Sequence, residues 1–242
     1  MVVNLQYFAG ALESELRDVY PHLRVPRLSI PPFCECNGVA ACASTAAVAS
    51  SESFIRFGRH FELDAGTETS EYLFIYIGSC ESLFLTSCMM TFNRSRFICY
   101  DPTTKTVKSD AWNVNKLLMK RYYMVERARD ATVVGILAGT LSASGYDDAK
   151  RRLKEAVRRA GKRSYVFSLG TLKVAKMANH ANVDVFVLIA CPENSLIDST
   201  EFYRPVVTPF EMELACDPSR QWTGNYEVDF RQLLPGGFKF KN

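Results

Sequence analysis

The sequence has no long apolar run and no cysteine spacing of the kind that binds zinc. No hydrophobic stretch approaches the ~20 residues that a membrane-spanning helix needs. The 8 cysteines include no CxxC pair, which argues against a structural zinc site of the usual two-pair kind. Residues 1–18 lack the basic start and small-residue cleavage site of a secretion signal. We therefore expect reduced thiols and a cytoplasmic protein without a membrane partner.

The sequence also has no large excess of positive or negative charge. The chain has 29 Lys and Arg residues against 26 Asp and Glu residues, a formal net charge of +3. The most basic segment, 149–163 (AKRRLKEAVRRAGKR), places Leu153, Ala156, Val157 and Ala160 on one helical face. Its charges then form the solvated face of an amphipathic helix, so no nucleic-acid partner is expected.

Complete catalytic motifs are absent as well. The segment GTLSASG (139–145) matches neither GxxxxGK[ST] nor GxGxxG, so a strand-to-helix turn is the preferred interpretation. The three histidines His22, His60 and His180 are scattered and have no evident Ser or Cys partner. We assign no catalytic residue.

What is present is an alternation of strands and helices, which favours parallel βαβ units and an α/β fold. We expect two similar three-layer α/β domains with mainly parallel sheets. They span residues 1–112, with a loop or disordered insertion at about 31–53, and residues 113–218, followed by a tail at 219–242. The expected strands are 1–6, 24–30, 71–77, 96–100, 132–138, 164–168 and 183–190, and the expected helices are 9–20, 82–91, 114–129, 147–160, 175–180 and a final turn at 211–216.

Cys191 is the candidate site residue. It follows the strand 183–190, and open parallel sheets bind ligands at the carboxyl ends of their strands. Two other strand ends, at Gly139 and Gly170, should lie beside it. A thiol here is either a packing residue or a ligand or nucleophile, and its spacing alone favours packing.

A second group of thiols, Cys34, Cys36 and Cys42, lies in the expected insertion. A metal-binding loop is conceivable there, but the surrounding Ala- and Ser-rich sequence offers no supporting ligands. Their role stays open.

Longer segments identify a family. The segments 121–142 (RYYMVERARDATVVGILAGTLS), 161–195 (GKRSYVFSLGTLKVAKMANHANVDVFVLIACPENS) and 202–218 (FYRPVVTPFEMELACDP) closely resemble the diphthamide-synthesis family. RFGRHFEL (56–63) and EYLFIYIG (71–78) fit as well. The resemblance is to the non-catalytic second subunits of eukaryotic members.

This resemblance implies three similar α/β domains around a cleft, each able to offer a cysteine to one 4Fe-4S cluster. In the catalytic subunit, the reduced cluster cleaves S-adenosylmethionine, and a 3-amino-3-carboxypropyl radical attaches to a histidine of translation elongation factor 2. The second subunit would form a heterodimer with the catalytic one. Its own cluster would receive electrons from an electron-donor protein and would help keep the catalytic cluster reduced.

By resemblance, Cys191 is the cluster ligand of the third domain. This assignment replaces the interpretation of Cys191 as a packing residue. No other residue is assigned as a ligand of a cofactor or metal. Lys162, Lys176 and the loop after Gly139 are placed at matching strand ends without an assigned role. The family's N-terminal domain has no counterpart here, so we expect a fragment, a short isoform or an incomplete gene model. The alternative function is a metal-free interaction or scaffold fragment that only pairs with the catalytic subunit.

Overall fold

The computed structural model describes residues 2–3, 9–28, 52–109, 111–138, 145–168, 173–191, 195–197, 202–220, 222 and 224–234. The chain forms two compact units. The first comprises residues 1–80 and 94–110, and the second comprises residues 81–93 and 111–242. None of the helices in the described ranges is both long and apolar enough to cross a membrane.

The first unit contains a mixed sheet in the order β1-β5-β6-β7. The strands β1 (Val2–Val3), β5 (Leu73–Ile77) and β6 (Arg96–Asp101) run parallel, and β7 (Thr106–Ser109) is antiparallel to β6. Alternate residues of β5 and β6 are buried, and the rings of Phe74 and Phe97 stack with centroids 5.1 Å apart. A short helix, α1 (Ala9–Leu16), and a 3-10 turn, η2 (Thr69–Glu71), belong to the same unit.

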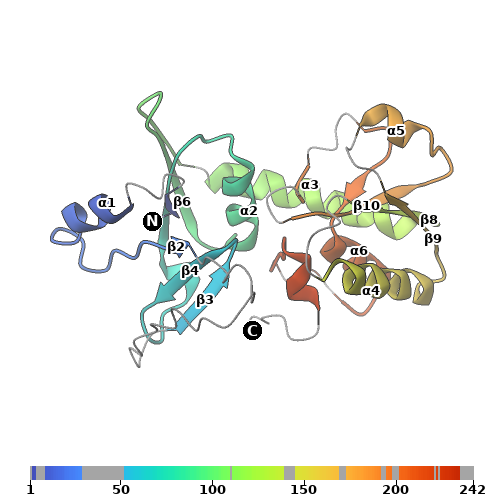
Figure 1. Ribbon diagram of the computed structural model, residues 1–242, viewed down its shortest axis with the longest axis horizontal. Coiled ribbons are helices and arrows are strands. Elements are labelled where there is room, and N and C mark those ends of the chain that lie inside the picture. The colour runs from blue at the N-terminus through green and yellow to red at the C-terminus, as the bar shows by residue number, and fades with distance from the viewer. Residues whose placement is uncertain are drawn as a thin grey trace, which may run out of the picture. The chain divides into compact units, whose positions relative to one another are not determined.

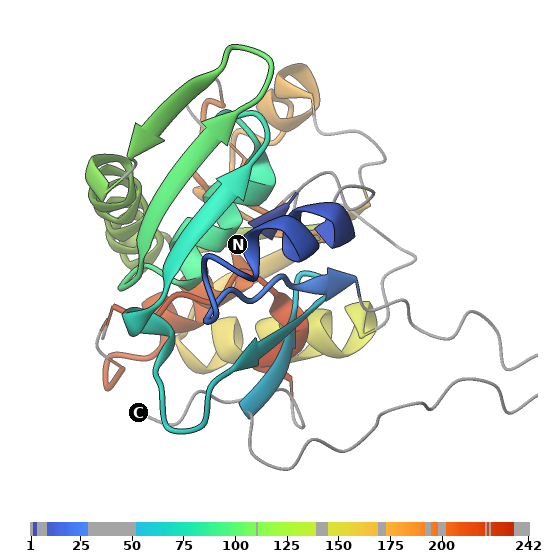
Figure 2. The ribbon, with the colours of Figure 1, turned by 90° about the vertical axis from the view of Figure 1, so that its left-hand side faces the viewer.

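A second, antiparallel sheet of the first unit has the order β2-β4-β3. The strands are β2 (Arg27–Leu28), β3 (Glu52–Arg56) and β4 (Arg59–Leu63), and Figure 2 shows the β3–β4 hairpin beside β2. Its two-residue turn places both Phe57 (φ 51°) and Gly58 (φ 66°) in the left-handed region, which is the conformation of a type I′ hairpin turn. The sequence interpretation missed this hairpin because Phe-Gly is not one of the usual turn pairs.

The second unit is built on a parallel sheet in the order β11-β10-β8-β9. The strands are β8 (Val133–Ala138), β9 (Arg163–Ser168), β10 (Val185–Ile189) and β11 (Val206–Val207). Its helices are α2 (Leu83–Thr91), α3 (Ala111–Asp130), α4 (Tyr146–Arg159), α5 (Val174–Ala178) and α6 (Pro209–Cys216), with a 3-10 turn η4 (Phe230–Leu233). The expected α/β fold is confirmed.

Helices cover both faces of this sheet, with α4 and α6 on one side and α5 on the other (Figure 1). Every residue of β8 and β10 is buried, as is typical of central parallel strands. On the α5 face, Gly135 leaves room for the ring of Phe186, because a Cβ at position 135 would lie 2.6 Å from a Phe186 ring carbon. The α5 face therefore depends on a residue without a side chain.

The basic helix α4 has the expected orientation. Leu153 and Val157 are fully buried, while Ala156 and Ala160 are half-buried at the edge of the same face. Its exposed charges pair along the helix, including Arg158 and Arg159 with Glu155. The interpretation as a solvated charged face is confirmed.

Helix α6 is longer than the single turn expected at 211–216. It begins at Pro209, and its first turn is closed by a capping box in which the Thr208 hydroxyl accepts from the Glu211 amide (3.3 Å) and the Glu211 carboxylate accepts from the Thr208 amide (2.8 Å). Proline at the first position and a capping box both favour a helix start. The local sequence TPFE therefore specifies where α6 begins.

A buried ion pair joins α3 to α6. The Arg121 guanidinium donates to both carboxylate oxygens of Glu211, with Nε to Oε1 at 2.6 Å, and the Glu211 side chain is completely buried. The Tyr226 hydroxyl donates to Glu211 Oε1 at 2.8 Å. Burial alone would lower the pKa of Arg121, but the negative charge of Glu211 reverses this and holds it above its ordinary value. The pKa of Tyr226 is also raised, mainly by burial and to a lesser extent by the negative charge of Glu211.

At the amino ends of the strands, Asp184 links β10 to β8. Its Oδ2 accepts hydrogen bonds from the Val133 amide (2.9 Å), the Thr132 hydroxyl (2.8 Å) and the Thr132 amide (3.0 Å). These hydrogen bonds lower the pKa of Asp184 below its ordinary value, against a smaller opposing effect of burial. The carboxylate therefore helps to fix the register of the two central strands.

Replacing Arg121 by Met should strongly destabilise the second unit. It leaves the Glu211 charge buried without its partner, which costs roughly 3–5 kcal/mol. The double variant Arg121→Met/Glu211→Gln should recover part of this loss, because no buried charge remains. Urea denaturation followed by tryptophan fluorescence, from Trp112 and Trp222 of the second unit, measures the free energy of unfolding. As a control, Arg151→Ala breaks only the exposed pair with Asp148 and should cost less than about 1 kcal/mol. An equal cost for Arg121→Met and the control would contradict the interpretation.

The Asp184→Asn variant should lose about 1 kcal/mol of stability at neutral pH through its hydrogen bonds. Because the folded-state pKa of Asp184 lies below its unfolded value, its contribution is complete above the unfolded pKa of about 4. It disappears as the pH falls through the folded pKa. The difference in urea midpoint between the two proteins should therefore shrink towards about pH 3. A difference that stays constant with pH would show that the charge of Asp184 contributes nothing.

Candidate functional site

The carboxyl ends of β8, β9 and β10 lie on one edge of the parallel sheet. Ala138 is paired in register with Ser168 on one side and with Ile189 on the other. Cys191 lies two residues beyond Ile189, so its place at the expected edge follows from the register. The loops after Gly139 and Gly170, and Pro192, lie outside the described residues.

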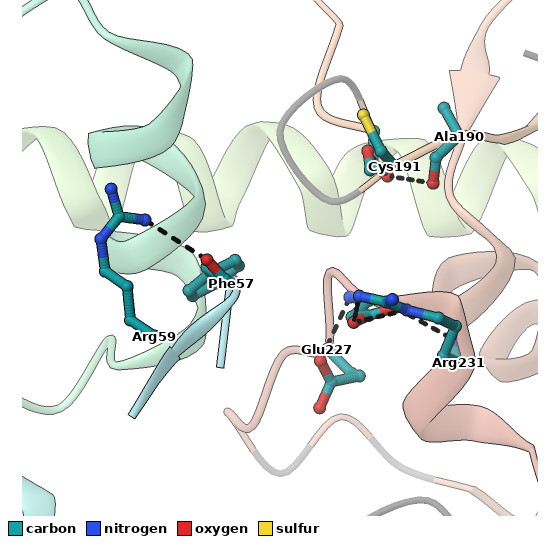
Figure 3. A network of polar contacts seen from close by, with 8 residues as sticks. Phe57, Arg59, Ala190, Cys191, Glu227 and Arg231 are labelled. Atoms are coloured by element: carbon teal, nitrogen blue, oxygen red, sulfur yellow. Dashed lines mark hydrogen bonds and ion pairs between the residues drawn. The ribbon is translucent and has the colours of Figure 1, made fainter. Parts of the chain in front are cut away.

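Ser195 holds the chain where it leaves β10. Its side chain is buried, and its hydroxyl lies 2.9 Å from the Cys191 carbonyl oxygen and 3.3 Å from the Ala190 carbonyl oxygen, to which it donates. These contacts hold Ser195 against the backbone at the end of β10. The Cys191 side chain is half-buried, and Figure 3 shows its sulfur pointing away from the Ala190 carbonyl. A thiol in this position is held by its backbone and remains partly accessible.

A charged group accompanies the thiol. Arg231, in η4, donates from Nη2 to Asp229 Oδ2 (2.7 Å) and from Nε to Asp229 Oδ1 (2.9 Å), and Glu227 accepts from the Asp229 amide (3.2 Å) (Figure 3). The hydrogen bond to Asp229 raises the pKa of Arg231, burial opposes this, and the negative charges of Asp229 and of an ionised Cys191 add to it. Arg231 therefore places a fixed positive charge within electrostatic range of Cys191.

Sequence reasoning gave Arg231 no role. An Arg two residues after an Asp (DFR, 229–231) is a short-range ion-pair pattern, but nothing in the local sequence places it near a strand end more than thirty residues away. Of the two lysines expected at matching strand ends, Lys162 lies elsewhere. Lys162 precedes β9 at its amino end, where its Nζ donates to the carbonyl oxygens of Arg129 (2.6 Å) and Ala131. Lys176 lies on the exposed side of α5.

The other described thiols have different surroundings. Cys88 and Cys99 are buried, and the Cys99 thiol donates to the Gly78 carbonyl at 3.6 Å. Burial raises the pKa of the Cys216 thiol to about 11. Cys80 is half-buried after β5, and all five described cysteines are free thiols. Cys34, Cys36 and Cys42 lie outside the described residues.

An iron–sulfur cluster needs several thiolates. Nowhere in the described part of the chain do three His, Cys, Asp or Glu side chains gather in a group that could hold a metal. Cys191 has the character of one cluster ligand, since it is partly accessible and near a cation, but these residues do not fit a complete cluster. Any further ligands would have to come from outside the described ranges.

A family model described as "Putative diphthamide synthesis protein" matches residues 9–227 of this chain. The chain belongs to the diphthamide-synthesis family. Among curated members of the family, 2-(3-amino-3-carboxypropyl)histidine synthase subunit 2 of Danio rerio is 47% identical over 235 residues, which is 97% of this chain and 47% of that protein. The subunit of the same name in Gallus gallus is 56% identical over 181 residues, 75% of this chain and 38% of that protein.

A solved structure has a similar fold. The crystal structure of Dph2 from Pyrococcus horikoshii with a 4Fe-4S cluster matches 64% of this chain and 42% of that chain, with a TM-score of 0.52 and 21% identity. This likeness shows a shared α/β fold. The chain spans less than half the length of these relatives.

Removing the Ser195 hydroxyl should make Cys191 more reactive. Ser195→Ala loses hydrogen bonds to the Ala190 and Cys191 carbonyl groups, worth about 1 kcal/mol. The backbone at Cys191 should therefore open more often, and alkylation of Cys191 should be roughly fivefold faster. Timed iodoacetamide labelling read by peptide mass spectrometry measures this rate at Cys191 alone. Ser219→Ala, which removes an exposed hydroxyl in the same unit, should leave the rate unchanged. Equal rates for Ser195→Ala and the unchanged chain would rule out a positioning role for Ser195.

Proposed function

We propose that this chain acts in the first step of diphthamide biosynthesis, as part of the non-catalytic second subunit of 2-(3-amino-3-carboxypropyl)histidine synthase. In that step, the 3-amino-3-carboxypropyl group of S-adenosylmethionine is transferred to a histidine of translation elongation factor 2. The accessory subunit pairs with the catalytic subunit and supports reduction of the catalytic cluster. The names of the curated relatives and the family match support this proposal.

The observation that carries the proposal is the position of Cys191. It follows the central strand β10 at the ligand-binding edge of a parallel sheet, and Ser195 fixes its backbone. Cys191 would supply one thiolate ligand to a 4Fe-4S cluster. When bound, such a cluster supplies one-electron transfer at a potential set by its surroundings.

The chain's own residues would prepare that ligand in two ways. Ser195 limits the movement of the backbone that carries the thiol, and Arg231 lies within electrostatic range of that thiol. Asp229 is buried and binds Arg231 through both oxygens, so the guanidinium is held in place. Fixed surroundings of this kind keep a ligand oriented.

The proposal predicts Cys191-dependent iron. The chain should be produced anaerobically with the catalytic subunit and reconstituted, and iron and sulfide should be measured per heterodimer and in the catalytic subunit alone. The pair should hold about four additional iron atoms, and Cys191→Ser should remove most of them. Cys216→Ser is a matched control, because that thiol lies in the same unit and its high pKa makes it a poor ligand.

Two results would contradict the proposal. Additional iron that remains in Cys191→Ser would exclude this thiol as a ligand. A heterodimer that forms without additional iron would instead favour a metal-free scaffold, which retains the pairing surface but no redox role.

A further inference from the structure

The outward face of α3 carries an apolar patch that the fold does not use. Met119 is 72% exposed, Tyr123 56% and Tyr122 45%. Single exposed apolar residues are ordinary, but these three lie within little more than one helical turn. We call Met119, Tyr122 and Tyr123, together with Phe210 and Trp222 beside them, the α3 patch.

The patch has a rigid foundation. The Tyr122 and Trp222 rings meet edge to face, with centroids 6.0 Å apart, and Trp222 contacts Phe210 (6.1 Å) and Tyr226 (5.6 Å). Tyr226 is buried and donates to Glu211, which in turn holds Arg121 of α3. Tyr122 therefore rests, through Trp222 and Tyr226, on the buried ion-pair network. Aromatic anchors held in place in this way lose little entropy when they bind a partner.

Positive charge borders the patch. Between residues 116 and 127, α3 carries Lys116, Lys120 and Arg127 on or beside the outward face, and Arg127 also donates to the Tyr123 hydroxyl (3.4 Å). Glu126 is the acidic residue of this stretch and pairs with Arg129 at 2.9 Å. Aromatic residues and Met at the centre with charges at the rim are typical of a protein interface.

We propose that the α3 patch is the docking surface for the partner subunit of the synthase, which would present an apolar socket bordered by carboxylates. This proposal rests on the proposed function, because the name "subunit 2" of the relatives implies a partner. A second copy of this chain is a poorer occupant. A two-fold interface through the patch would bring the cations of Lys116 and Lys120 close to those of the other copy.

The test measures binding of this chain to the immobilised catalytic subunit by biolayer interferometry. Met119→Glu places a carboxylate at the centre of the patch and should weaken binding at least about tenfold. Lys116→Glu/Lys120→Glu should mainly slow association, and salt should slow association of the unchanged chain. All three positions lie on the exposed or half-exposed side of a helix, and Glu is a good helix former, so the variants should fold.

Tyr203→Glu is the matched control, because Tyr203 is 79% exposed and lies outside the patch. It should change the dissociation constant less than about twofold. Unchanged binding by both α3 variants would overturn the proposal, as would failure of the unchanged chain to bind. Iron measured in the same samples separates this outcome from the proposed function. If the unchanged chain binds its partner but the pair holds no Cys191-dependent iron, the cluster role is contradicted and the docking surface stands.

Discussion

The buried pair of Arg121 and Glu211 is the interaction on which the second unit most depends. Removing both charges from water is costly, and this cost is met only because the carboxylate receives two guanidinium bonds, the Tyr226 hydroxyl and the Thr208 amide. Each donor comes from a different part of the chain. The pair therefore ties α3, the start of α6 and the segment around Tyr226 into one arrangement, and a partial arrangement would leave a buried charge without its partners.

This arrangement extends towards the surroundings of Cys191 and towards the α3 patch. The segment that carries Tyr226 continues into η4, which contains Arg231 and its partner Asp229. On the outer side, Tyr226 supports Trp222, and Trp222 supports Tyr122 of α3. The segment around Tyr226 thus connects the buried charges both to η4, which carries Arg231, and to the aromatic base of the α3 patch. The proposed function would use both, as a fixed ligand environment and as a stable contact with a partner.

Much of the second unit could be predicted from its sequence because its signals are local. The buried strands VVGILA and VFVLI are continuous apolar runs, and α4 has a clear apolar stripe that ends before Gly161. The first unit was less predictable. The hairpin of β3 and β4 depends on a Phe57-Gly58 turn that gives no recognised signal, and β7 is an exposed edge strand with no apolar alternation. Its pairing with β6 is formed by contacts across the sheet.

The sequence by itself determined the α/β class and the family, because these depend on periodicity and on residues close together in the chain, and it predicted Cys191 as the site residue. Only the tertiary structure decided which groups surround Cys191. Ser195 is near it in sequence, but Arg231 comes within electrostatic range of it from η4, and Lys162 lies at the opposite end of the sheet. Glu211 likewise gives no sign in sequence that it will meet Arg121, ninety residues earlier. The physical reason is that burial and charge pairing act through space, whereas periodicity and capping act along the chain.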